Sequence, residues 1–160
     1  MAEIVVLGAG LGGTLIPYEL VDQLRPEDRL TVIGQGRTYH FVPSNPWVAV
    51  GWREQPDIEI DLEPVMRKKN VRFLTQGAAR VDPSARVVQV ADGTSISYDY
   101  LVIATGPELA FDEIPGLGPD GHTQSICHVD HAVRAHAAFE PFYERFLMRQ
   151  LNIEKLKEPT

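Results

Sequence analysis

A glycine-rich turn between a buried strand and a helix stands near the start of the chain. Residues 4–7 form a short, wholly apolar run, which predicts a strand buried on both faces. Gly8-Ala9-Gly10-Leu11-Gly12-Gly13 follows, and residues 12 to about 25 are expected to form a helix whose inward stripe is Leu15, Tyr18, Leu20, Val21 and Leu24. Gly8 permits the tight turn, Gly10 lets the backbone approach a pyrophosphate, and Gly13 lets the helix pack close to the strand. With the free N–H groups of the helix N-terminus, this predicts a dinucleotide site at Gly8, Gly10, Leu11, Gly12 and Gly13.

The next expected strand, residues 30–33, ends without the acidic residue that usually binds the ribose. The chain has Ile33-Gly34-Gln35-Gly36-Arg37 at that point. Gln35 can hydrogen-bond a ribose, and Arg37 can face a phosphate. A basic residue here also suits NADP, so this segment leaves the identity of the dinucleotide open.

A second apolar strand, which ends in small residues, helps to identify the dinucleotide. Tyr100-Leu101-Val102-Ile103 runs into Ala104-Thr105-Gly106, where small residues permit close approach of a dinucleotide. Three short strands precede it, at about 78–81, 86–90 and 94–98, the last two joined by the turn Ala91-Asp92-Gly93. This arrangement resembles flavoproteins of the pyridine-nucleotide–disulfide reductase type. We therefore expect Ala104, Thr105 and Gly106 to contact FAD.

Two further stretches carry a more specific resemblance. They are Tyr39-His40-Phe41-Val42-Pro43-Ser44-Asn45-Pro46-Trp47 with Gly51-Trp52-Arg53, and Gln124-Ser125-Ile126-Cys127-His128-Val129-Asp130-His131-Ala132. Both are similar to sulfide:quinone oxidoreductases and, more distantly, to the flavoprotein subunit of flavocytochrome c sulfide dehydrogenase. The resemblance implies that Gly8, Gly10 and Gly13 meet the pyrophosphate of FAD. It also implies that Gly34 and Arg37 lie by the ribose, Ala79 by adenine, and Pro43 and Ser44 near the isoalloxazine.

The expected fold is therefore α/β, a Rossmann-like FAD-binding domain with a parallel sheet, a three-stranded β-meander and C-terminal helices. We assign residues 1–137 to this domain, with the meander inserted at about 77–98, and residues 138–160 to an amphipathic helical tail. The tail should contain one helix ending near 139 and another over 141–151, joined at Pro141. Its apolar stripe contains Phe139, Phe142, Tyr143, Phe146, Leu147 and Leu151. Residues 140–145 and 151–157 resemble the C-terminal tail of the family, which implies a family member whose middle is missing.

The resemblance implies a flavin-dependent oxidation of sulfide through a pair of cysteines, but this chain has one cysteine. A disulfide relay within the chain is thereby excluded. Cys127 is the candidate catalytic thiol, and His128 and His131 can lower its pKa; the alternative is a structural residue at a loop–helix join. We expect no metal site, since only Asp130 adds a carboxylate to these histidines. The chain alone should have little or no activity towards sulfide and quinone.

Two other functions fit the sequence. The chain can be a non-catalytic FAD- or ADP-binding module that dimerises through the surface left by the missing half, or an NADP-binding reductase fragment. The net charge of −7 argues against nucleic-acid binding. No apolar run approaches the roughly 20 residues of a spanning helix, and the N-terminus lacks the pattern of a signal peptide, because the apolar run over residues 4–7 is too short and no basic segment stands before it. We expect a cytoplasmic protein with peripheral membrane contact as an option.

Overall fold

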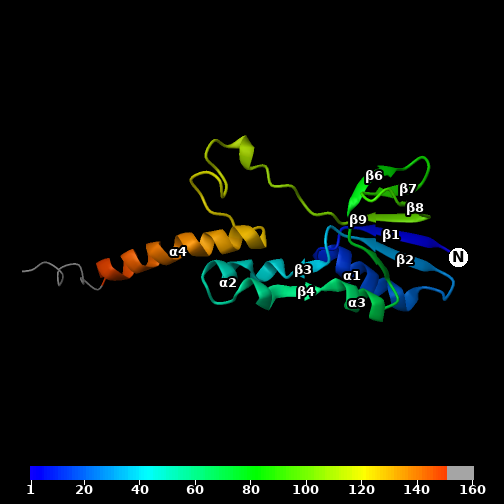
Figure 1. Cartoon of the computed structure of the whole chain (residues 1–160), viewed down its shortest axis with the longest axis horizontal. Helices are drawn as coiled ribbons and strands as arrows, with labels where there is room; N and C mark the ends of the chain where they lie inside the picture. The colour runs from blue at the N-terminus through cyan, green and yellow to red at the C-terminus, as the bar shows by residue number, and fades with distance from the viewer. Residues whose placement is uncertain (151–160) are drawn as a thin grey trace, which may run out of the picture. The chain divides into compact units, whose positions relative to one another are not determined.

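The computed structural model describes residues 1–150 of the chain (Figure 1). These residues divide into two compact units. The first contains Met1–His40 and Glu59–Glu108, and the second contains Phe41–Ile58 and the chain from Leu109 onward. The division at residues 137 and 138 that the sequence suggested stays a prediction.

The first unit is built on a four-stranded parallel sheet in the order β5-β2-β1-β9. Its strands are β1 (Glu3–Leu7), β2 (Arg29–Ile33), β5 (Arg72–Leu74) and β9 (Tyr100–Ile103). The chain builds outward from β1 to β2 and β5 and later returns to the other side of β1 as β9. The strand order therefore reverses between β1 and β9, which is where open parallel sheets usually bind their ligands.

The two faces of this sheet are covered differently. Ile4 and Val6 of β1 pack on the helical face, with α1 (Leu11–Leu20) and α3 (Leu62–Lys68) above them. Val5 and Leu7 pack on the other face against the antiparallel meander (Figure 1). The meander strands are β6 (Ala78–Asp82), β7 (Val87–Val90) and β8 (Ser95–Ser97). Burial on both faces explains the continuous apolar run of β1 and confirms the predicted parallel sheet and meander.

The inward face of α1 differs from the expected one. The sequence suggested Leu15, Tyr18, Leu20, Val21 and Leu24 as the buried stripe, but Leu15 and Tyr18 are 54% and 41% exposed. Ile16 packs on the core in their place, and the other expected residues, Leu20, Val21 and Leu24, also pack on it. The buried Gly13 and Pro17 set the helix face, since residues three to four apart share it. A 3₁₀ turn at Val21–Gln23 then ends the α-helix sooner than expected.

The segment over residues 34–57 contains several short elements of regular structure. Strand β3 (Thr38–His40) pairs antiparallel with β4 (Glu59–Asp61) in the first unit. Between them, in the second unit, lie α2 (Asn45–Ala49) and the 3₁₀ turns Val42–Ser44 and Gln55–Ile58. The loop after β9 contains one further 3₁₀ turn, Phe111–Glu113.

The second unit is organised around one long helix, α4 (Val129–Gln150). Ala132 and Ala135 of α4 pack on Val48 and Ala49 of α2. The expected break at Pro141 was wrong: the helix continues through it. A proline removes one N–H donor from the ladder, while ring contacts between residues four apart support the helix around it: Phe139 stacks on Tyr143, and Phe142 stacks on Phe146. Leu151 and the tail match over 151–157 lie outside the described residues, and no helix among the described ones is long and apolar enough to cross a membrane.

Candidate functional site

Two glycines of the loop after β1 are held where no other residue fits. Gly8 has φ +97°, and a Cβ there would lie 2.2 Å from the carbonyl oxygen of Ala104. A Cβ on Gly13 would lie 1.9 Å from the carbonyl oxygen of Gly8. These contacts press the start of α1 against the loop and against the end of β9. The close approach predicted from the sequence is thus present in the backbone of this unit.

Gly10, between them, is open. It is the N-cap residue of α1, and nothing lies within 4 Å of the position its Cβ would take. The first N–H groups of a helix have no partner within the helix, and Gly10 has no side chain to cap them. The first turn also has no acidic residue that would oppose an anion. The N–H groups at Leu11, Gly12 and Gly13 therefore fit a pyrophosphate, with the positive end of the helix dipole behind them.

The end of β9 lies at the same place. The Ala104 N–H donates to the Leu7 carbonyl at 2.7 Å, and a Cβ on Gly12 would lie 3.8 Å from Cβ of Ala104. Thr105 and Gly106 follow, both exposed, and Gly106 has φ +78° with open space around it. The structure thus brings both sequence motifs together at the point where the strand order reverses.

A second group of predicted residues gathers beyond the end of β2. Gly34 is buried, and a Cβ there would meet Cβ of Ala9 at 2.7 Å. Gln35 forms an isolated bridge with Gln76, and the Gly77 N–H donates to the Gly34 carbonyl at 2.9 Å. Ala79 lies at an irregularity of β6, exposed, two residues after Gly77. Gly77, at φ +77°, belongs to this group and was missed, although a glycine before the meander was a usable signal.

Arg37 has partners that sequence reasoning missed. Its Nε donates to Asp61 Oδ1 at 3.1 Å, its Nη2 donates to Asp61 Oδ2, and Nη2 lies 3.2 Å from Glu63 Oε2. Asp61 holds the pKa of Arg37 above its ordinary value, and Arg37 in turn lowers the pKa of Asp61. The guanidinium is therefore already matched by two carboxylates, which come from β4 and α3 and are distant in sequence.

In the second unit, the segment around Pro43 and Ser44 is fixed by side chains. Ser44 is fully buried, and its Oγ accepts from Arg53 Nη1 at 3.0 Å, while the Arg53 guanidinium lies 4.2 Å from the Trp47 ring centroid. Pro43 is exposed beside it. Asn45 is also fully buried, and its Oδ1 has no hydrogen-bond partner among the described residues. A buried acceptor of this kind is uncommon and suits a ligand that donates a hydrogen bond.

Asn45 also joins the two stretches that carried the specific resemblance. Its Nδ2 donates to the Ile126 carbonyl at 2.9 Å across 81 residues of sequence. Cys127 follows and is exposed, with its N–H donating to Ser125 Oγ at 3.3 Å. His131 Nδ1 lies 3.1 Å from the same Ser125 Oγ. Residues 1–150 contain no group of three histidine, cysteine, aspartate or glutamate side chains arranged to hold a metal ion.

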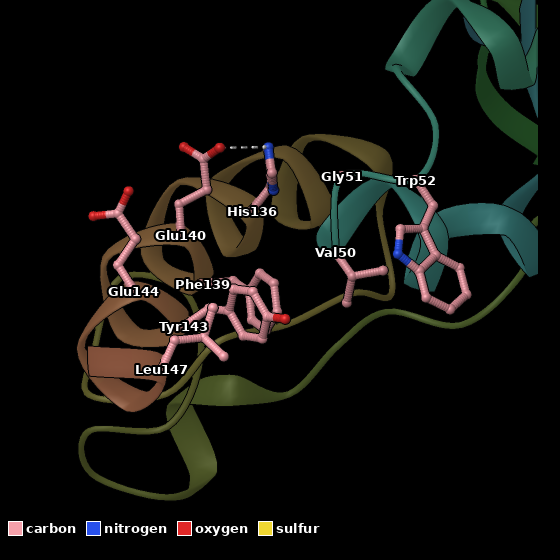
Figure 2. A pocket seen from close by; sticks show the side chains of 9 residues that line it. All are labelled: Val50, Gly51, Trp52, His136, Phe139, Glu140, Tyr143, Glu144 and Leu147. Carbon is pink, nitrogen blue, oxygen red and sulfur yellow. Dashed lines mark ion pairs between the residues drawn. The ribbon is translucent and has the colours of Figure 1, made fainter. Parts of the chain in front are cut away.

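A pocket of about 640 Å³ also lies within the second unit (Figure 2). Phe139 and Tyr143 extend from α4 towards Val50, with ring centroids 5.4 Å apart. His136 Nε2 pairs with Glu140 Oε1 at 3.7 Å on one side. The remaining lining residues are Gly51, Trp52, Glu144 and Leu147. The walls are thus largely aromatic and aliphatic, with a polar pair at one end.

Comparison with known proteins defines the class. The sequence profile of the pyridine nucleotide-disulphide oxidoreductase family matches residues 2–146. The chain belongs to this family, whose cofactor is FAD.

Within that family, several similar proteins are sulfide:quinone oxidoreductases, and others are NADH-ubiquinone oxidoreductases, such as external NADH-ubiquinone oxidoreductase 2 of Saccharomyces cerevisiae, which is 30% identical over 124 residues, 72% of this chain and 22% of the relative. The sulfide-quinone reductase of Aquifex aeolicus is 37% identical over 141 residues, which cover 88% of this chain and 32% of the relative. The crystal structure of the sulfide:quinone oxidoreductase from Aquifex aeolicus matches with a TM-score of 0.76 and 33% identity, over 90% of this chain and 33% of that one. The mitochondrial sulfide:quinone oxidoreductase of Dictyostelium discoideum is 27% identical over 132 residues, 80% of this chain and 29% of the relative. The chain spans about a third of the length of these sulfide:quinone oxidoreductases.

Proposed function

We propose that the first unit binds FAD, with the pyrophosphate on the N–H groups at the start of α1. The observation that carries this proposal is the open N-cap at Gly10, held between two positions that admit only glycine. Gly34, Gln35 and Arg37 then lie by the ribose, and Ala79 with Gly77 lies by adenine. Ala104, Thr105 and Gly106 border the dinucleotide from β9. Bound FAD would supply an acceptor for two electrons, and these residues would hold and orient it.

The ion pairs of Arg37 favour FAD over NADP. A 2′-phosphate needs a basic partner, but the guanidinium of Arg37 is engaged by Asp61 and Glu63. These carboxylates would also repel a nearby phosphate. Titration of the protein with FAD and with NADP, followed by intrinsic fluorescence, should show binding of FAD alone. Tight NADP binding that displaces FAD would contradict the assignment.

Gly10→Ala tests the site directly. A methyl group at this position meets nothing in the protein, so the fold should be kept, whereas it would lie where the pyrophosphate approaches. We expect FAD affinity to fall about tenfold or more, which is about 1.4 kcal/mol. Leu15→Ala, on the exposed side of the same helix, is the control. Equal FAD affinity in the wild-type protein and Gly10→Ala would remove the proposal.

For activity, we propose a flavoprotein of the sulfide:quinone type with little or no turnover as a lone chain. The reaction class is suggested by the names of the relatives. Weak activity is expected because the chain has a single cysteine, so no second thiol is present to complete a disulfide relay. Cys127 stays a prediction as a reactive residue, and Pro43 and Ser44 stay predictions as isoalloxazine contacts. Sulfide-dependent reduction of a soluble quinone, measured with added FAD, is the test. Turnover that survives Cys127→Ser would exclude a role for this thiol.

A second candidate function rests on the pocket beside α4. We propose that an apolar ring such as a quinone occupies it between Val50 and the ring pair Phe139 and Tyr143. Phe142 and Phe146, which continue the same helix and are 60% and 47% exposed, would favour contact with a membrane surface. In a Trp47→Phe background, a short-chain quinone should quench the fluorescence of Trp52. Quenching that is unchanged in Tyr143→Ala, or absent altogether, would reject this site.

A further inference from the structure

The outer edge of β9 differs from the rest of the sheet. Tyr100 and Ile103 of β9 are 65% and 66% exposed, whereas Val5 and Val6 of the adjacent β1 are fully buried. Side chains alternate along a strand, so Tyr100 and Ile103 lie on opposite faces. The exposure is therefore a property of the strand edge and not of one face.

Backbone groups along this edge are free for pairing. The Ala104 N–H donates to Leu7 of β1, and the register sets Val102 beside Val6. Hydrogen-bonding direction alternates along a strand, so the N–H and C=O groups of Leu101 and Ile103 turn away from β1. Among the described residues β9 is the last strand of its sheet, and no other strand pairs with that side.

The two edges of the sheet are protected unequally. The opposite edge strand, β5, has three residues, one of them the exposed Arg72. Strand β9 has the sequence Tyr-Leu-Val-Ile, with no charge, no proline and no bulge. Charges, prolines and bulges are the means by which proteins keep edge strands from pairing with other chains. Only the β9 edge lacks all of them.

We infer that β9 pairs antiparallel with β9 of a second copy of the chain, about a two-fold axis at Val102. In this register Leu101 of one copy faces Ile103 of the other, and the two residues exchange both backbone hydrogen bonds. Around a two-fold axis, the same side chains of the two copies lie close together, so a charged strand would face like charges in its partner. Strand β9 has no charged residue, so this repulsion does not arise. The result is a sheet continuous across two chains, formed independently of FAD.

Ile103→Pro is the sharpest test. Its N–H points away from β1, so proline removes a donor to the partner and none from the ladder with β1. Ile103→Thr keeps both the N–H and a β-branched side chain and is the matched control. Sedimentation equilibrium should show a wild-type dimer at micromolar concentrations, an Ile103→Thr dimer, and a dissociation constant raised about tenfold or more in Ile103→Pro. A monomeric wild-type chain, or equal dimers in both variants, would overturn the inference.

Ile103→Lys covers the case in which the proline variant does not fold. It keeps every backbone group and adds a charge to an exposed position at the edge, so it should also weaken the dimer. Arg72→Glu, at the opposite edge, should leave the dimer unchanged. Far-ultraviolet circular dichroism and FAD affinity report on the fold of each variant. A monomeric protein that binds FAD refutes the edge pairing alone, and a dimer that does not bind FAD refutes the proposed cofactor alone.

Discussion

The candidate sites of the two units are held in place by different parts of the chain, backbone in the first unit and side chains in the second. In the first, the candidate site is made of backbone: Gly8 and Gly13 are fixed by close contacts, and Gly10 is left open. In the second, it is made of buried side chains: Asn45 bonds Ile126, which is 81 residues away in sequence, and Ser44 bonds Arg53, which is 9 residues away. A backbone site depends on where side chains are absent, and a side-chain site depends on which partners are present. Mutations should therefore damage the two units in different ways.

The largest effect is expected from Gly13→Ala in the first unit. A Cβ 1.9 Å from the Gly8 carbonyl oxygen forces the backbone to move. We expect a loss of about 3 kcal/mol in the free energy of unfolding together with loss of FAD binding. Urea denaturation with and without FAD measures both. Hydrogen exchange in α2 and the start of α4 should be unchanged, and a loss of protection there would show that the units are not separable.

Asn45→Leu is the corresponding test in the second unit. It removes the donor to the Ile126 carbonyl and leaves that oxygen unpaired. The expected cost is about 2 kcal/mol, with faster hydrogen exchange over residues 125–128. Asn45→Asp, which keeps the shape but not the donor, should have the same effect on exchange. If both variants exchange at the same rate as the wild-type protein, the hydrogen bond between Asn45 and Ile126 does not contribute to stability.

Gly51→Ala should have a smaller effect, because a side chain can move where backbone cannot. Gly51 has φ +72°, and a Cβ there would lie 2.5 Å from Cε1 of His136. We expect a loss of about 2 kcal/mol and a changed pocket. Gly93→Ala is the matched control, since φ is +90° but nothing lies within 4 Å. The difference between the two unfolding energies isolates the collision with His136, and equal losses would mean that the ring moves aside freely.

The smallest effect concerns Asp61 and is seen in acid. Arg37 lowers the pKa of Asp61 below its ordinary value of 3.8, so the pair stabilises the fold above that value. This contribution is lost as the pH falls through the lowered pKa. Asp61→Asn should be less stable than the wild-type protein at neutral pH, and the gap should close below about pH 3.8. Thermal unfolding across this range measures it, and because asparagine can still cap α3, a gap independent of pH would show that the charge of Asp61 is not the source of the loss.

The same contrast explains what the sequence could predict. The role of Gly8, Gly10 and Gly13 could be predicted because the spacing of glycines indicates where the backbone turns tightly or approaches another segment. The role of Ala104 at the end of β9 could be predicted in the same way, since it is also a small residue at a close approach. The strands that are buried on both faces could also be predicted, from their continuous apolar runs. The partners of Arg37 were not, because Asp61 and Glu63 are ordinary surface residues until β3 and β4 pair.

Other features depended on tertiary packing. Nothing local distinguishes Asn45 from a helix-capping residue, and only the fold shows that it is buried against Ile126. Pro141 predicted a break by local rules, but the helix continues, with Phe139 stacked on Tyr143 and Phe142 stacked on Phe146. Leu15 and Tyr18 were wrongly assigned to the core, because the buried side of α1 is the one that carries Gly13 and Pro17.

The continuity of α4 limits how such a chain can be altered. Each residue turns an α-helix by about 100°, so residues before and after position 137 share one rotational phase. Inserting a single residue there would swing Phe139 and Tyr143 away from Val50, while Ala132 and Ala135 stayed on α2. Only insertions or deletions of nearly whole turns would preserve both surfaces. Segments of different origin can therefore be joined within this helix only in phase.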